Sequence, residues 1–174
     1  MTPITLKTYQ QTALDALGAF ARAARTKGPA LAFGELVGRP YRADAFGPDV
    51  PCVCLRIPTG GGKTVMAAHA VPLLARAWCN VDAPVAVWLV PSDAIRQQTL
   101  KALQTPGHPY RAALTAAYGE ALQVCVLDEV AQIARPTGGA RPSCWWPPSR
   151  AFASRTRASA MCIAFPRASS RISG

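Results

Sequence analysis

The chain has 174 residues, a formal net charge of +10 and hydrophobic residues at 50% of its positions. This length is enough for one domain with a buried core, but not for a motor protein built from two such domains. No apolar run is long enough to cross a membrane, and residues 1–10 lack the features of a signal peptide, so we expect a cytoplasmic protein without a membrane partner. The six cysteines and two histidines include no C-x-x-C pair, which argues against a zinc site.

The first predicted element is a helix over residues 5–25, because Leu14, Leu17 and Phe20 recur at helical spacing and Thr8 is a candidate N-cap. Residues 27–49 contain glycine, proline and scattered charges. They are interpreted as a connecting segment with a short helical turn around 31–37.

A short apolar run bounded by prolines, Cys52–Ile57, predicts a buried strand that leads directly into a glycine loop. An alanine-rich helix is expected over 63–78, and Pro72 within it should kink or split the helix. Pro84–Val90 predicts a second buried strand, followed by a helix over 92–103 that Ser92 caps.

A third helix over 109–122 and a third strand over 123–127 complete an alternation of strands and helices. Such an alternation predicts an α/β domain, with a parallel sheet covered by helices on both faces.

The glycine loop, residues 58–64, reads Pro-Thr-Gly-Gly-Gly-Lys-Thr and has the composition of a nucleoside-triphosphate phosphate loop. Glycines at 60–62 let main-chain N–H groups converge on phosphate oxygens. Lys63 can reach the β- and γ-phosphates, the Thr64 hydroxyl can coordinate Mg²⁺, and the helix that begins there directs its positive end at the anion. A nucleoside triphosphate, ATP or GTP, and Mg²⁺ are therefore the expected ligands, although Ile57 occupies a position at which the strict consensus has glycine.

Three segments together resemble the DEAD/DEAH-box helicases of superfamily two. The glycine loop is similar to their motif I, which tolerates a non-glycine first position. Residues 90–99, Val-Pro-Ser-Asp-Ala-Ile-Arg-Gln-Gln-Thr, are similar to motif Ia, and Leu6-Lys-Thr-Tyr-Gln10 is similar to the upstream L-x-x-Y-Q element. The restriction subunit of type III restriction enzymes is the relative that these segments resemble most. The resemblance covers about residues 5–134 and implies an incomplete, RecA-like first helicase lobe of the P-loop NTPase fold.

The resemblance also implies roles for individual residues. Gln10 would contact adenine, and Thr59 to Thr64 would hold the phosphates and Mg²⁺, with Lys63 and Thr64 as the catalytic residues. Ser92, Arg96 and Gln98 would contact a nucleic-acid backbone. As alternatives, Gln10 is an exposed helix residue and Gln98 belongs to a solvated helix face. In the intact protein the expected partners are DNA and a modification subunit.

Hydrolysis in this class also needs an Asp for Mg²⁺ and a Glu that orients the attacking water. Asp128-Glu129 follows a predicted strand and is the candidate pair. The pair lies early in the chain and is followed by Val130-Ala131 rather than the usual Ala-His. We therefore favour a strand-end acidic pair over the family's carboxylate motif.

The chain divides at about residue 134. Residues 1–134 hold 12 Lys and Arg against 9 acidic residues, a net charge of +3, whereas residues 135–174 hold 7 Arg and no acid. The second segment has no sustained period of 2 or 3.6, so we expect it to be disordered or poorly packed. Reading Cys144-Trp145-Trp146-Pro147 from the third base of the cysteine codon gives the strand-like Leu-Val-Ala. A shifted reading frame near 134–139 is therefore our hypothesis, which the nucleotide sequence of the gene tests. The alternative is a natural Arg-rich tail that binds nucleic acid.

The sequence thus predicts the ATP-binding N-terminal portion of a DNA helicase or translocase, unable to hydrolyse ATP alone. The alternative is a non-catalytic nucleotide-binding module or an inactive gene remnant. A different phosphate-loop enzyme, such as a small kinase, would leave the resemblances at residues 6–10 and 90–99 unexplained.

Overall fold

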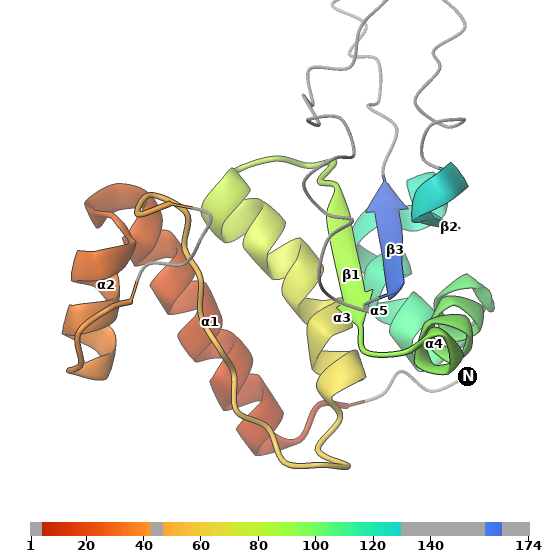
Figure 1. The fold of residues 1–174 in the computed structure, drawn as a ribbon, viewed down its shortest axis with the longest axis horizontal. Helices are drawn as coiled ribbons and strands as arrows, with labels where there is room; N and C mark the ends of the chain where they lie inside the picture. The colour runs from red at the N-terminus through yellow and green to blue at the C-terminus, as the bar shows by residue number, and fades with distance from the viewer. Residues whose placement is uncertain (1–4, 43–46, 130–158, 165–174) are drawn as a thin grey trace, which may run out of the picture.

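The computed structural model describes residues 5–42, 47–129 and 159–164. Helices α1 and α2 lie on one side of the molecule and a small sheet with α4 and α5 on the other, while α3 lies between them (Figure 1). The elements are α1 Thr8–Lys27, α2 Pro29–Val37, α3 Lys63–Leu74, β1 Ala86–Val90, α4 Asp93–Gln104, α5 Pro109–Tyr118, β2 Gln123–Val126 and β3 Ser159–Ala164. None of the described helices combines the length and the hydropathy needed to span a bilayer.

The first helix forms as predicted, with Leu14, Leu17 and Phe20 buried along it. The predicted N-cap, Thr8, is wrong by one residue, because Lys7 is the cap and Thr8 is the first helical residue. The main-chain N–H of Lys7 donates to Oε1 of Gln10 at 2.9 Å. A glutamine at the third helical position therefore satisfies the cap residue's N–H.

The predicted short turn after α1 is a nine-residue helix, α2. Pro29 is its first residue, a position that needs no N–H donor, and Gly38 ends it in the left-handed conformation with φ of 69°. The Phe33 ring on α2 packs edge-on against Phe20 of α1, with ring centroids 6.1 Å apart. These aromatic contacts hold α2 to the end of α1.

The predicted strand at Cys52–Ile57 is wrong, since residues 51–58 have no regular secondary structure and pair with no described strand. Val53 and Ile57 pack instead beside the buried side chains of α1 and α3. The main-chain N–H of Cys52 donates to the hydroxyl of Tyr41 at 2.7 Å. A side chain therefore provides a hydrogen bond that a neighbouring strand would otherwise supply, and the segment packs along α1 rather than within the sheet.

The interruption predicted at Pro72 takes the form of a change in helix type. Helix α3 continues through Pro72 to Leu74, and a π-helix then covers Ala75–Cys79. Proline cannot donate the usual hydrogen bond to the preceding turn, and the π-helix that begins three residues later has i→i+5 hydrogen bonds in place of the i→i+4 bonds of α3. Asn80, left-handed with φ of 53°, ends the element.

The predicted parallel sheet is not what the described strands form. Their order is β1-β3-β2, and β3 is antiparallel to both neighbours, with Val90 opposite Ser159 and Val126 opposite Met161. Strands β1 and β2 run in the same direction, as the alternation of elements predicts, but β3 lies between them. The strand at Ser159–Ala164 lies within the segment that was expected to be disordered or poorly packed, and it pairs with both outer strands. The other residues predicted to be disordered lie outside the described ranges.

The described helices cover one face of this sheet. The central cluster of Ala68, Leu103, Leu114 and Leu122 packs against Trp88 of β1, whereas Val87 and Leu89 on its other face are exposed. Because side chains alternate along a strand, this pattern marks one buried and one open face. The expected helices on both faces are thus present on one face only within the described residues.

Candidate nucleotide-binding site

The phosphate loop has a conformation that requires glycine at particular positions. Gly60 and Gly62 both have φ of 77°, a region that residues with a Cβ rarely adopt. A Cβ on Gly61 would lie 2.6 Å from Cγ2 of Ile57 and 2.9 Å from the carbonyl oxygen of Pro58. The Gly61 N–H donates to that same Pro58 oxygen at 3.0 Å and closes the turn. The loop therefore has the compact main-chain fold on which a phosphate cradle depends.

Helix α3 begins directly after this loop at Lys63. The first N–H groups of a helix have no partner within it and carry its partial positive charge. The N–H of Met66 already bonds to Gly62 at 3.0 Å, so the donors that precede it face the loop. Thr64, the predicted Mg²⁺ ligand, is half-buried in this first turn.

The Lys63 ammonium group lies over the start of the loop. Its Nζ donates to the carbonyl oxygens of Ile57 at 3.0 Å and Pro58 at 2.9 Å. The side chain is exposed, so the charge is accessible to a ligand. A flexible ammonium group held at a glycine loop can exchange these carbonyls for phosphate oxygens. The glycines, the helix start and this lysine together fit a nucleotide phosphate group.

Two neighbouring residues of α1 hold the loop from its other side. The Nε2 of Gln10 donates to the carbonyl oxygen of Gly61 at 3.0 Å, and the Tyr9 hydroxyl donates to the same oxygen at 2.9 Å. Gln10 is 6% exposed, so the alternative of an exposed helix residue is wrong. Its predicted contact with adenine stays a prediction, because the amide here bonds to the loop and to Lys7.

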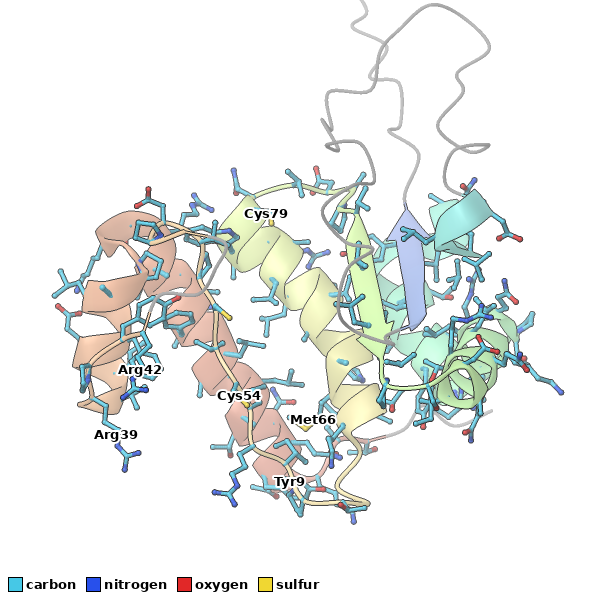
Figure 2. All side chains as sticks on the ribbon, viewed as in Figure 1. Tyr9, Arg39, Arg42, Cys54, Met66 and Cys79 are labelled. Atoms are coloured by element: carbon cyan, nitrogen blue, oxygen red, sulfur yellow. The ribbon has the colours of Figure 1, made fainter. Side chains whose placement is uncertain are left out.

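Figure 2 shows Tyr9 at the loop end of α1, with Met66 between α1 and α3. Tyr9 was not among the site residues predicted from the sequence. The available signal was its place beside Gln10 in the Leu-Lys-Thr-Tyr-Gln segment. Its hydroxyl contacts a residue 52 positions away in the chain, a pairing that no local pattern reveals.

The predicted nucleic-acid contacts follow β1. Ser92 caps α4, where its Oγ accepts a hydrogen bond from the N–H of Ile95 at 3.4 Å. Nε of Arg96 donates to Oδ1 of Asp93 at 2.7 Å, and Gln98 is exposed. The carboxyl end of β1 and the start of α3 lie at the same end of the molecule (Figure 1). The structure thus explains the structural role of Ser92, while contact of all three with nucleic acid stays a prediction.

The candidate carboxylates lie in a 3₁₀ turn, Leu127–Glu129, directly after β2. Oε2 of Glu129 accepts a hydrogen bond from the N–H of Val126 at 3.1 Å and so closes the end of its own strand. Burial, followed by the nearby Glu129 charge, raises the pKa of the Cys125 thiol. The contact with the Val126 N–H agrees with a structural, strand-end role for Glu129.

Comparison with known families matches residues 3–129 to the family described as type III restriction enzyme, res subunit. The match covers well over half of the chain. The chain belongs to the type III restriction enzyme res subunit family. No curated protein and no solved structure matches it.

The family match confirms the resemblance drawn from the motifs and carries the P-loop NTPase fold with it. The matched segment contains the phosphate loop, Tyr9 and Gln10, and the turn at Leu127–Glu129. Residues 3–129 of this res subunit family member are therefore an ATP-binding, helicase-like module. The unpaired segment before the loop and the inserted strand β3 are the two places where the described fold differs from the predicted sheet.

Proposed function

We propose that this chain binds ATP with Mg²⁺. It would be the N-terminal, nucleotide-binding portion of a DNA translocase or helicase similar to the restriction subunit of type III restriction enzymes. The observation that carries the proposal is the phosphate loop, in which two positive-φ glycines and the start of α3 converge beside the Lys63 ammonium group. Main-chain donors and a mobile cation at one helix N-terminus form a general anion site.

Each residue of the loop has a separate task in this proposal. The N–H groups of 60–64 would donate to phosphate oxygens, Lys63 would neutralise the β- and γ-phosphates, and Thr64 would ligate Mg²⁺. Thr59 would shape the entrance of the loop. Tyr9 and Gln10 would hold the Gly61 carbonyl and keep the loop in its binding conformation, and Gln10 would recognise adenine.

The chain is proposed to hold ATP without hydrolysing it alone. Hydrolysis requires a carboxylate that orients water and cationic groups from a second lobe. The Glu129 carboxylate accepts the Val126 N–H, a structural contact at the end of β2. This observation also supports the second candidate function, a nucleotide-binding module without catalysis.

DNA and a modification subunit are the proposed partners of the intact protein. Ser92, Arg96 and Gln98 are the proposed contacts to the strand backbone, because they follow β1 at its carboxyl end, where α/β domains place their ligands. Arg96 would exchange its Asp93 partner for a phosphate.

Binding of a fluorescent ATP analogue, with and without Mg²⁺, tests the proposal. Lys63→Ala should abolish saturable binding, whereas Lys101→Ala, which removes an exposed lysine from α4, should leave it unchanged. Thr64→Ala should weaken binding mainly in the presence of Mg²⁺. Equal affinity of the wild-type protein and Lys63→Ala would refute the site.

An ATPase assay with and without duplex DNA then separates the two candidate functions. Turnover that Lys63→Ala abolishes would show that the chain is catalytic and would reject the non-catalytic module. Saturable binding with no turnover in either condition would support that module.

A further inference from the structure

A cavity with a volume of about 810 Å³ lies away from the phosphate loop. It is lined by the C-terminal half of α1, the junction of α3 with the π-helix, and α5. Arg22 on α1 contributes to it, while Gln10 contacts the phosphate loop from the same helix. The two residues are twelve positions apart, which corresponds to about 18 Å along the helix axis, so the cavity and the loop are separate sites.

Three arginines line this cavity. Arg22 and Arg25 lie one turn apart on α1, and Arg76 lies on the π-helix. The ion pairs of the described residues are Lys27 with Glu35 and Arg96 with Asp93, so none of these three guanidinium groups is neutralised by a described carboxylate. The cavity is therefore lined by three positively charged side chains, two from α1 and one from the π-helix, and no described carboxylate forms an ion pair with them.

The rest of the cavity lining is mainly apolar. It consists of Pro72, Leu73 and small alanine side chains from the π-helix and α5. His69 also lines the cavity, and burial lowers its pKa, so its imidazole is neutral near pH 7. The three arginines are exposed, so water solvates them in the absence of a ligand. A ligand with both an anionic group and an apolar body would contact the arginines and these apolar walls together.

We propose that this cavity binds a small organic phosphate, a molecule with a phosphate group on a compact apolar body. Guanidinium groups bind phosphate through paired, charge-assisted hydrogen bonds, and Arg suits this geometry better than Lys. The cavity volume lies within the range of small-molecule sites, which are mostly apolar with a few polar anchors. The site is independent of the proposed ATP site, because no residue of the phosphate loop contributes to it.

Titration of the full chain with 1-naphthyl phosphate tests this proposal by calorimetry. We expect saturable binding that Arg76→Gln and Arg22→Gln each weaken at least tenfold. Arg39→Gln, which alters an exposed arginine on a different part of the surface (Figure 2), should leave the affinity within twofold. Lys63→Ala should also leave it unchanged, which separates this site from the phosphate loop.

A second variant keeps all three arginines and fills the space. Ala116 lines the cavity and is exposed, so Ala116→Phe should be tolerated and should abolish binding. Loss of binding in this variant, with an unchanged circular dichroism melting curve, would support the site.

Several results would overturn the proposal. These are equal binding of 1-naphthol, equal binding of inorganic phosphate, or loss of binding in Lys63→Ala. If Arg39→Gln weakened the binding of 1-naphthyl phosphate as strongly as Arg76→Gln, the binding would depend on overall positive charge rather than on this cavity. Arginine-dependent binding of a short DNA duplex without binding of 1-naphthyl phosphate would assign the surface to nucleic acid instead.

Discussion

The side-chain amide of Gln10 donates a hydrogen bond to the carbonyl oxygen of Gly61, 3.0 Å away, although the two residues are 51 positions apart in the sequence. The Tyr9 hydroxyl donates to the same oxygen, and Oε1 of Gln10 accepts the N–H of Lys7. One buried amide therefore joins the start of α1 to the phosphate loop. A substitution that removes this amide should therefore change both the stability of the fold and the affinity for nucleotide.

Gln10→Ala should lower the free energy of unfolding by about 1–3 kcal/mol, because it removes a buried donor and the acceptor for the Lys7 N–H. ATP affinity should fall as well, since the Gly61 carbonyl would lose one of the two side-chain donors that it has among the described residues. Urea unfolding and nucleotide titration measure the two effects. Gln11→Ala is the matched control, because Gln11 is exposed and its side-chain amide donates to Asp15 on the same helix. Equal effects of the two substitutions would contradict this role for Gln10.

Gly62→Ala should abolish nucleotide binding and destabilise the fold. Its φ of 77° costs a residue with a Cβ about 1–2 kcal/mol, and the new methyl group would also clash with Nε2 of Gln10. Gly38→Ala separates these two causes. Gly38 has a similar φ of 69°, yet nothing lies within 4 Å of a Cβ built there. Chemical unfolding should therefore show a larger decrease in the free energy of unfolding for Gly62→Ala than for Gly38→Ala. Equal decreases would mean that the clash with Gln10 contributes little.

Elements with local signals were predictable from the sequence. The start of α4 could be predicted because Ser92 caps its own helix, and β1 and β2 because each is a short apolar run between breakers. Gln10 was recognised from a motif, but its burial against Gly61 was not, since that contact depends on how α1 packs on the loop.

The errors in the sheet have a common physical cause. The run at Cys52–Ile57 has the apolar composition of a strand, but the same composition suits an extended segment packed on α1, and only hydrogen-bonding partners distinguish the two. In the same way, Ser159–Ala164 becomes a strand because β1 and β2 each offer it an edge. Strand pairing is a non-local property, so neither outcome could be obtained from periodicity. The three-arginine cavity is likewise assembled from helices distant in sequence.

Leu103→Ala should lower the free energy of unfolding by about 2–5 kcal/mol, because Leu103 is fully buried in the cluster beneath the sheet. Leu31→Ala makes the same chemical change at a residue that is 54% exposed on α2, and it should cost far less. Urea denaturation of both variants checks the difference. Similar losses would show that this cluster is not the stabilising core.

The pH dependence of stability should depend on His69. Burial lowers its pKa from the ordinary value of 6.5, so the folded state binds a proton less readily than the unfolded state. Above about pH 6.5 both states carry a neutral imidazole, and the free energy of unfolding is insensitive to this group. Below that pH the unfolded state is protonated first, so stability should decrease as the pH falls towards the lowered pKa of the folded state.

Chemical denaturation of the wild-type protein, His69→Gln and His108→Gln between pH 8 and pH 5 measures this contribution. His69→Gln should flatten the decrease, whereas His108→Gln leaves the His69 contribution in place. Arg22, Arg25 and Arg76 line the same cavity, so a bound organic phosphate would bring negative charge close to the imidazole. That charge favours the imidazolium form and should reduce the acid sensitivity of the wild-type protein. An unchanged slope in His69→Gln would assign the acid sensitivity to other groups.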